Sequence, residues 1–387
     1  MPVLNRIASF AEEMKGWRRH LHQYPELAFD CHKTAAWIVA RLREMGVDEI
    51  HEGIAQSGVV AVINGQGPGP VMGLRADMDA LPIEEMTGAE YASKVPGKMH
   101  ACGHDGHVTM LLGAAKYLAE TRNFAGKVVL LFQPAEEDGG GGQVMVQEGV
   151  MERFGIETVY GIHNAPNVAF GHFYTTPGPL MASVDTAYVK VLGKGGHGAT
   201  PHETVDPVVA IVAMVQAVQT IIPRNVYALD EAVISVTMIH TGSASNVIPE
   251  DGMFAATIRC FKPDVRDLLK KRFYEIVEGT ASAFGVTAEI DYDWGYPATI
   301  NHEAEAAFAA EVAREVAGAD AVDDRANREM GSEDFSYMLE ARPGAYLFLG
   351  TGPGAGLHHA GFDFNDEAAP LGASFFARLV EKGQPLR

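Results

Sequence analysis

Histidine, cysteine and carboxylate side chains gather in short clusters along this sequence. Residues 100–107 read His-Ala-Cys-Gly-His-Asp-Gly-His, and the glycine between Cys102 and His104 lets both side chains turn toward one point. A thiolate and an imidazole are typical ligands of zinc and similar borderline metals. The cluster therefore favours a metal site, while a polar helix N-terminus with a buried cysteine is the alternative explanation.

A second cluster, residues 134–138, places three carboxylates next to one another. Their mutual repulsion makes such a run costly in a confined site unless cations neutralise it. A solvated acidic loop is the alternative, but the apolar strand predicted just before the cluster and the glycines 139–142 after it favour a site. In such a site one of Glu136 and Glu137 can bind metal while the other accepts a proton from water.

Further candidate groups come after predicted apolar strands, directly or in the following loop. They are Asp77 and Asp79, His163, and His358 and His359. A lone histidine is more often a surface or hydrogen-bonded residue than a ligand. However, sites of open α/β sheets form at the carboxyl ends of the strands. We therefore expect these groups to share one edge of the sheet.

The elements that must position these groups alternate between helix and strand patterns. Helices are predicted over residues 12–22, 34–45, 108–121 and 369–381, and strands over 58–64, 71–76, 127–132, 158–162 and 345–349. Continuous apolar strands that alternate with helices imply an α/β fold whose mostly parallel sheet is covered on both faces.

A different pattern occupies residues 182–294. Strands are predicted over 186–192, 232–239, 252–261 and 286–292, and helices over 207–222 and 263–284. This order, βαββαβ, is typical of a ferredoxin-like α+β sandwich. We therefore predict a discontinuous catalytic, metal-binding domain, residues 1–181 and 295–387, interrupted by an inserted domain.

The composition limits the classes of function. The 387 residues suit about two domains, and 47% hydrophobic content is enough to fill their cores. A net charge of −20 without basic patches argues against nucleic acid and anionic membranes as partners. The three cysteines are too few for a disulfide scaffold and favour a reducing compartment. The sequence also lacks a signal-peptide pattern and a run of about 20 apolar residues, so a cytoplasmic protein is predicted.

Longer motifs run nearly from end to end of the chain. They are Arg18-Arg-His-Leu-His22, Pro25-Glu-Leu27, Leu74-Arg-Ala-Asp-Met-Asp-Ala-Leu-Pro82, residues 100–107, Gln133-Pro-Ala-Glu-Glu137, Gly161-Ile-His163, Gly193-Lys-Gly-Gly-His-Gly-Ala-Thr-Pro-His202, Asn246-Val-Ile-Pro249, Gly331-Ser-Glu-Asp-Phe335 and Phe362-Asp-Phe-Asn-Asp366. In this order they resemble the two-metal aminoacylases and carboxypeptidases, and within them the hippurate hydrolase and auxin-conjugate amidohydrolase branch.

The resemblance implies two divalent metal ions per subunit, manganese or zinc, or else cobalt or nickel. The ligands that it implies are Cys102, His104, Glu137, His163 and His358. Many relatives have Asn at the position of His359, so the choice between the two histidines stays open, and the alignment favours His358. Cys31 stands where most relatives have glutamate.

The resemblance also implies roles outside the ligand set. Glu136 corresponds to the general base, and His197 to a histidine that reaches across a dimer to stabilise the oxyanion. Asn246 and Arg259 fall where the wider family contacts the substrate carboxylate. The inserted domain corresponds to a lid and dimerisation domain, so a homodimer or a dimer-based tetramer is expected.

The implied activity is hydrolysis of the amide bond of N-acyl amino acids, either hippurate-like or N-acetylated. Cations would polarise the acyl carbonyl and activate a water, and Glu136 would pass the water's proton to the leaving amine. The same chemistry on dipeptides or on N-acetyl-diaminopimelate is the alternative. A cysteine hydrolase with Cys102 as nucleophile leaves Glu136 and Glu137 unexplained, and a non-enzymatic metal-binding protein does not need Glu136.

Overall fold

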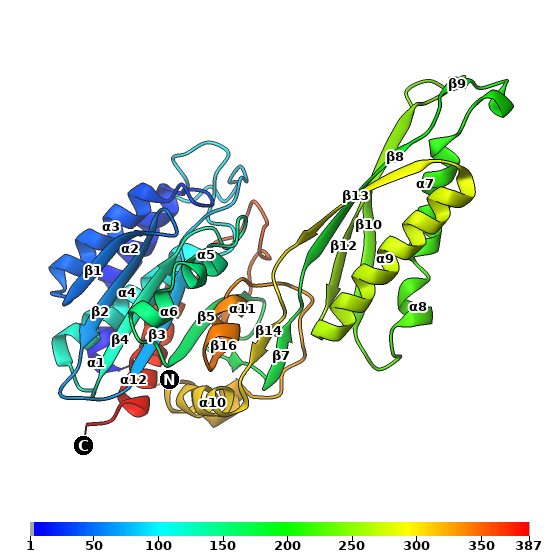
Figure 1. Ribbon diagram of the computed structural model, residues 1–387. Helices are drawn as coiled ribbons and strands as arrows, with labels where there is room; N and C mark the ends of the chain where they lie inside the picture. Colours follow the sequence, from blue (N-terminus) through cyan, green and yellow to red (C-terminus); the bar gives the residue numbers. More distant parts are fainter. Residues whose placement is uncertain (1–3, 387) are drawn as a thin grey trace. The chain divides into compact units, whose positions relative to one another are not determined.

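The computed structural model describes residues 4–386, which form two compact units. The first unit holds the described residues up to Leu180, the segment Ile300–Asn327 and the described residues from Asp334 onward. The second unit holds Met181–Thr299 and the short segment Arg328–Glu333. Each unit has a hydrophobic core of its own, and the first unit is made from separate stretches of the chain (Figure 1).

An eight-stranded mixed sheet forms the centre of the first unit, with the order β1-β2-β4-β3-β5-β16-β6-β15. The strands are β1 (Glu49–Ile54), β2 (Gly58–Asn64), β3 (Val71–Asp77), β4 (Lys127–Gln133), β5 (Thr158–Pro166), β6 (Phe173–Tyr174), β15 (Val322–Asp323) and β16 (Gly344–Gly352). The four central strands β4, β3, β5 and β16 run parallel. Antiparallel pairing occurs between β1, β2 and β4 and between β16 and β6. The predicted mostly parallel sheet is confirmed, with antiparallel additions toward both edges.

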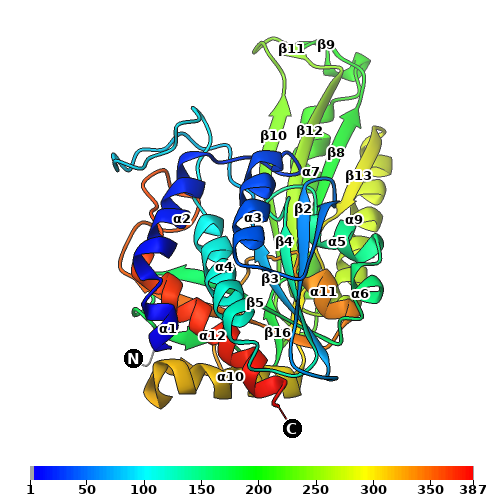
Figure 2. The same cartoon turned by 90° about the vertical axis from the view of Figure 1, so that its left-hand side faces the viewer.

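Helices cover both faces of this sheet (Figure 2). One side carries α2 (Ala11–Gln23), α3 (His32–Glu44), α4 (His104–Thr121) and α12 (Ala369–Gly383), and the other carries α5 (Gly141–Gln147), α6 (Val150–Arg153) and α11 (Ser336–Ala341). Helix α10 (Glu303–Ala317) packs against α12 and β16. Helix α4 is buried along most of its length because α2, α3 and α12 pack against it.

Four details of the elements differ from the sequence-based prediction. Strand β5 continues to Pro166 because it pairs with β16 as far as Gly352, so His163 lies inside the strand and not after it. Helix α4 begins at His104, four residues earlier than predicted. The predicted helix 207–222 is two helices, α7 (Pro207–Val218) and α8 (Ile221–Asn225). Strand β1 was not predicted, and its largely exposed side chains give no buried alternation.

The second unit is a four-stranded antiparallel sheet in the order β10-β12-β8-β13. Its strands are β8 (Asp185–Leu192), β10 (Ala232–Thr241), β12 (Asp251–Cys260) and β13 (Thr287–Trp294), and its long helices are α7 and α9 (Pro263–Phe284). In chain order the strands are arranged 2-3-1-4, which is the ferredoxin-like arrangement that the βαββαβ pattern predicts. A two-stranded ribbon of β9 (Gly196–His197) and β11 (Val247–Ile248) belongs to the same unit.

Within the described residues, every helix is too short or too polar to cross a membrane.

Candidate metal centre

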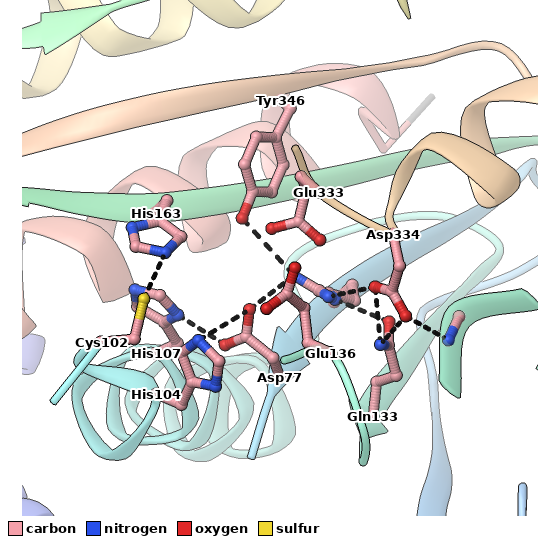
Figure 3. Close-up of polar contacts among 12 residues, drawn as sticks. Asp77, Cys102, His104, His107, Gln133, Glu136, His163, Glu333, Asp334 and Tyr346 are labelled. Atoms are coloured by element: carbon pink, nitrogen blue, oxygen red, sulfur yellow. Dashed lines mark hydrogen bonds and ion pairs between the residues drawn. The ribbon is translucent and has the colours of Figure 1, made fainter. Parts of the chain in front are cut away.

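The carboxyl ends of the parallel strands and the start of α4 supply a cluster of side chains that could hold metal ions in the first unit. They are Cys102 and His104 at the start of α4, Glu136 and Glu137 after β4, His163 on β5, and His358 in the loop after β16. This loop, residues 353–366, is called the His358 loop below. Figure 3 shows four of these side chains, Cys102, His104, Glu136 and His163.

Among these six residues the potential ligand atoms form three groups, each within 4.8 Å: Cys102, His104 and His163; Cys102, Glu137 and His358; and His104, Glu136 and Glu137. His104 is also grouped with Asp77 and His107. The Cys102 Sγ lies 3.4 Å from the His163 Nε2. The Glu137 Oε2 lies 3.4 Å from the His358 Nε2, and the Glu137 Oε1 lies 3.7 Å from the His104 Nε2. The first two groups share the Cys102 thiol, so the cluster has the form of two adjoining sites.

Several of these atoms are buried without the hydrogen bonds that such atoms usually make. Among the described residues, the His104 Nε2 and the Glu137 Oε1 have no hydrogen-bond partner. Buried polar atoms are nearly always satisfied, and a metal ion is a common reason for atoms of this kind to converge. The His104 Nδ1 also has no hydrogen bond among the described residues, and it lies 3.4 Å from the Asp79 Oδ1, a position from which a carboxylate can orient a metal-bound imidazole. The residues therefore fit divalent cations.

The electrostatics of the cluster point the same way. Burial raises the pKa of the Cys102 thiol well above its usual value, with nearby carboxylates adding to the effect. Burial opposes charge on His104, but the surrounding carboxylates, Asp77 first, still raise its pKa to about 10. The pocket is thus short of positive charge, and a bound cation would favour the thiolate and the neutral imidazole.

Glu136 and Glu137 are held by a tight turn after β4. Ala135 adopts a left-handed conformation with φ of 57°. The backbone N–H groups of Glu136 and Glu137 each donate to one oxygen of the Asp79 carboxylate, both at 3.1 Å. One buried carboxylate therefore fixes the backbone of both glutamates, and the Glu136 side chain is itself buried.

A buried ionic network adjoins the cluster. The Arg75 guanidinium donates to Asp77 at 2.7 Å, to Asp334 at 2.9 Å and to Gln133 at 2.9 Å. Asp77 also accepts from the His107 Nδ1 at 2.5 Å. The sequence-based reasoning assigned no role to Arg75 or Asp334, although both lie in motifs that carry the family resemblance.

His107 and His359 are held by other bonds. The backbone N–H of Asn164 donates to the His107 Nε2 at 3.0 Å, so both ring nitrogens of His107 have protein partners. The His359 Nδ1 accepts from the N–H of Gly361 within its own loop. His358, in contrast, belongs to the group with Cys102 and Glu137.

The remaining candidate residues lie in the second unit. His197 is exposed on β9, and its Nδ1 accepts from the N–H of Ala199 at 3.0 Å. Asn246 lies next to it, because β9 pairs with β11 and the Asn246 carbonyl accepts from Gly198 at 2.8 Å. Arg259 lies near the far end of β12 from this ribbon, donates to the Met330 carbonyl at 2.8 Å, and has a pKa lowered by burial. The structure thus brings His197 and Asn246 together, but not Arg259.

Comparison with known proteins agrees with this geometry. The chain is 42% identical over 371 residues to the N-acetyl-L-cysteine deacetylase of Bacillus subtilis, covering 96% of this chain and 88% of the relative. It is 38% identical over 382 residues to the hippurate hydrolase of Campylobacter jejuni, covering 99% of both chains. It also superposes on a crystal structure from Bacillus subtilis, a dinuclear metal-binding peptidase from the M20 family, with a TM-score of 0.83, 33% identity and coverage of 96% and 98%.

The predicted resemblance is therefore confirmed. The model of the family described as peptidase family M20/M25/M40 matches residues 73–382, which is most of the chain. With the end-to-end similarity to the relatives and the cluster of ligand groups, this match shows that the chain belongs to peptidase family M20/M25/M40.

Proposed function

We propose that this protein is a metal-dependent amidohydrolase that cleaves the amide bond of N-acyl amino acids. The observation that carries the proposal is the pair of ligand groups that share Cys102, with the buried carboxylate of Glu136 directly beside them. The two similar enzymes, named for N-acetyl-L-cysteine and for hippurate, support N-acyl amino acids as the substrate class.

In this proposal five side chains hold two divalent cations: Cys102, His104, Glu137, His163 and His358. The mixture of thiolate, imidazole and carboxylate suits manganese or zinc, and cobalt or nickel as substitutes. When bound, the cations polarise the acyl carbonyl and lower the pKa of a water toward about 7.

Glu136 is the general base. Its carboxylate belongs to the same 4.8 Å group as the ligand atoms of His104 and Glu137, so a proton taken from water travels a short distance. The Asp79 carboxylate, which accepts from the N–H groups of Glu136 and Glu137, holds this turn in place during the transfer. Glu136 then gives the proton to the leaving amine, which departs as the amino acid.

His197 is the proposed oxyanion donor. Its Nδ1 accepts a hydrogen bond, so the neutral ring carries its proton on Nε2 and presents that N–H as a donor. Donors of this kind contribute about 2.7–4 kcal/mol to the transition state in comparable sites. Asn246, beside it, and Arg259 are the proposed contacts of the substrate carboxylate.

The proposal extends to assembly and compartment. A homodimer, alone or within a tetramer, would let His197 serve the site of the partner subunit. The exposed edge strands β10 and β13 support pairing between copies. The three cysteines are free and buried, which supports a reducing, cytoplasmic setting.

Chelation and a substrate panel test the proposal. Protein stripped of metal should be inactive, and manganese, zinc, cobalt or nickel should restore hydrolysis in proportion to the ions bound. The panel contains hippurate, N-acetyl amino acids, a dipeptide and N-acetyl-diaminopimelate, so that the alternative substrates are tested alongside. Full activity in protein verified as metal-free would overturn the proposal and would favour a cysteine hydrolase with Cys102 as the nucleophile.

A further inference from the structure

Two motifs outside the ligand set meet at the end of the His358 loop. One is Arg18-Arg-His-Leu-His22 on α2, and the other is Phe362-Asp-Phe-Asn-Asp366 at the end of the loop. We propose that Arg18 is a positioning residue that anchors the His358 loop and so sets the affinity for the cation held by Cys102, Glu137 and His358. This inference rests on the proposed function, because it concerns one of the two cation sites.

Arg18 is buried among carboxylates from different parts of the chain. Its side chain is 1% exposed. The Nε donates to the Asp366 Oδ1 at 2.6 Å, and Nη1 donates to the Asp363 Oδ1 at 3.0 Å. The Asp105 carboxylate, next to His104, lies 3.7 Å from Nη1. Both hydrogen bonds to carboxylates therefore go to the His358 loop, and a buried arginine fork of this kind fixes direction as well as distance.

The first half of the His358 loop has little packing of its own. It begins with Pro353 and Gly354 and contains a further glycine, Gly356, so its first half has few packed side chains. The side chain of His358 is 55% exposed and its backbone has a φ of 60°, a left-handed conformation that a residue with a Cβ rarely adopts. The His358 N–H donates to the Ala101 carbonyl at 2.8 Å, and the Ala360 carbonyl accepts from the Met86 N–H at 2.8 Å. Phe362 and Phe364 pack the end of the loop into the core, so Arg18 adds direction to an end that is already buried.

Tyr91 adds to the same anchor. Its hydroxyl donates to the Asp363 Oδ2 at 2.6 Å. The Arg18 guanidinium lies 4.6 Å from the centre of the Tyr91 ring. Asp363 is thus held at both carboxylate oxygens, by Arg18 and by Tyr91, between the buried side chains of Phe362 and Phe364.

Helix α4 has a separate tie to α2. The His22 Nδ1 donates to the Asp105 Oδ2 at 2.8 Å, so Asp105 keeps a partner when Arg18 is changed. Loss of Arg18 should therefore disturb His358 more than His104. This asymmetry separates the proposal from a purely structural role, in which the whole protein becomes less stable and neither cation site is singled out.

The test measures the affinity for each of two ions in three variants. Arg18→Lys keeps the charge but not the fork, and Asp363→Ala removes the loop end of the anchor. Arg19→Met is the matched control, because Arg19 also bonds to Asp366 but is 35% exposed. Zinc or cobalt is titrated into stripped protein, with circular dichroism and thermal melts to establish folding. With cobalt, the thiolate charge-transfer band reports on the geometry around Cys102.

Arg18→Lys and Asp363→Ala should each lower the affinity for the ion at Cys102, Glu137 and His358 by about 10–100-fold, the range for partners that orient ligands. The affinity for the other ion should stay nearly unchanged. Arg19→Met should bind both ions nearly as the wild type does, because Asp366 keeps its bond to Arg18 and Asp363 keeps both of its partners. If Arg18→Lys fails to fold, Asp363→Ala decides alone, since that aspartate is 37% exposed and its loss is easier to tolerate.

Wild-type affinity for both ions in a folded variant, or equal weakening of both, would overturn the role of Arg18. A wild-type protein that binds no ions would instead overturn the proposed function. The two failures are therefore distinguishable.

Discussion

Glu136 and Glu137 are neighbours in the chain, yet their side chains have different surroundings. The Glu137 carboxylate lies between His104 and His358, at 3.7 Å and 3.4 Å from their Nε2 atoms. Burial raises the pKa of Glu137, but the contacts with His358 and His104 outweigh this effect and lower it overall. Glu137 is thus placed to stay ionised, as its proposed role as a ligand requires, and Glu136 is the carboxylate proposed for proton transfer.

Replacement of each glutamate by glutamine separates these roles. Glu136→Gln should keep both metals and lose turnover by about 10²–10⁴-fold, the contribution of a positioned general base. Glu137→Gln should lose metal as well, because an amide is a poor ligand for these cations. Metal content by elemental analysis and turnover on one N-acyl amino acid are the measurements. Identical metal content and identical residual rates in the two variants would contradict this division.

At the scale of elements, the start of α4 depends on one glycine. Gly103 lies between Cys102 and His104 and has a φ of 91°. A Cβ at this position would overlap the side chain of Asn164. Gly97 also has a positive φ, 72°, but has open space around it.

These two glycines make a matched pair of substitutions. Gly97→Ala should lower the free energy of unfolding by about 1–2 kcal/mol, the cost of a left-handed alanine. Gly103→Ala should cost more and should also weaken metal binding at least ~10-fold, because it displaces the two ligands that flank it. Denaturant unfolding and metal titration measure the two effects. Equal losses in both variants, with metal affinity intact, would show that the crowding at Asn164 is unimportant.

Helix α2 carries a buried histidine whose charge depends on pH. Burial disfavours charge on His22, but its bonds to Asp105 and Glu85 raise its pKa to about 9. In the unfolded chain the pKa is about 6.5. Between these two values the folded protein binds the proton more tightly, so the stabilisation is complete below about pH 6.5 and is lost as the pH rises toward 9.

His22→Gln should remove this dependence. The difference in the free energy of unfolding between wild type and variant should shrink between pH 6.5 and 9, by on the order of 3 kcal/mol. His32→Gln, at an exposed histidine on α3, is the control and should follow the wild-type curve. A wild-type minus His22→Gln difference that stays constant over this range would rule out a charged His22.

For the whole molecule, the important fact is that the proposed catalytic groups belong to two units. The ligands and Glu136 lie in the first unit, and His197 lies on the ribbon of the second. The ribbon is exposed, and the His197 ring accepts a hydrogen bond from the Ala199 N–H in its own turn. His197 is therefore free to serve a site other than one in its own ribbon.

Hybrid dimers test whether His197 serves the partner subunit. His197→Ala and Glu136→Gln should each be nearly inactive with metals bound. When the two are refolded together, hybrid dimers should regain a substantial fraction of activity, because one composite site then has both the intact base and the intact histidine. Absence of recovery in heterodimers confirmed by mass would mean that His197 acts in its own subunit or not at all.

Much of this protein could be predicted from local patterns. Apolar residues recur at the spacing of the buried face, and this spacing differs between helices and strands. For this reason the predicted bounds of α2, β4 and α9 are close to the observed ones. The order βαββαβ likewise predicted the arrangement of the second sheet. The types and spacing in residues 100–107 and 134–138 indicated metal chemistry, because thiolate, imidazole and carboxylate groups have few other reasons to gather in one short segment.

Only the tertiary structure decided which distant residues meet. The position of His163 inside β5 depends on pairing with β16, a strand far away in the sequence. The pairing of Arg18 with Asp363 and Asp366, and of Arg75 with Asp334, joins residues hundreds of positions apart. The residues around an arginine in the sequence do not identify its ion-pair partner, because the partner is determined by which distant segments the fold brings next to it. The sequence therefore indicated the proposed ligands, whereas the groups that hold these residues in place became visible only in the tertiary structure.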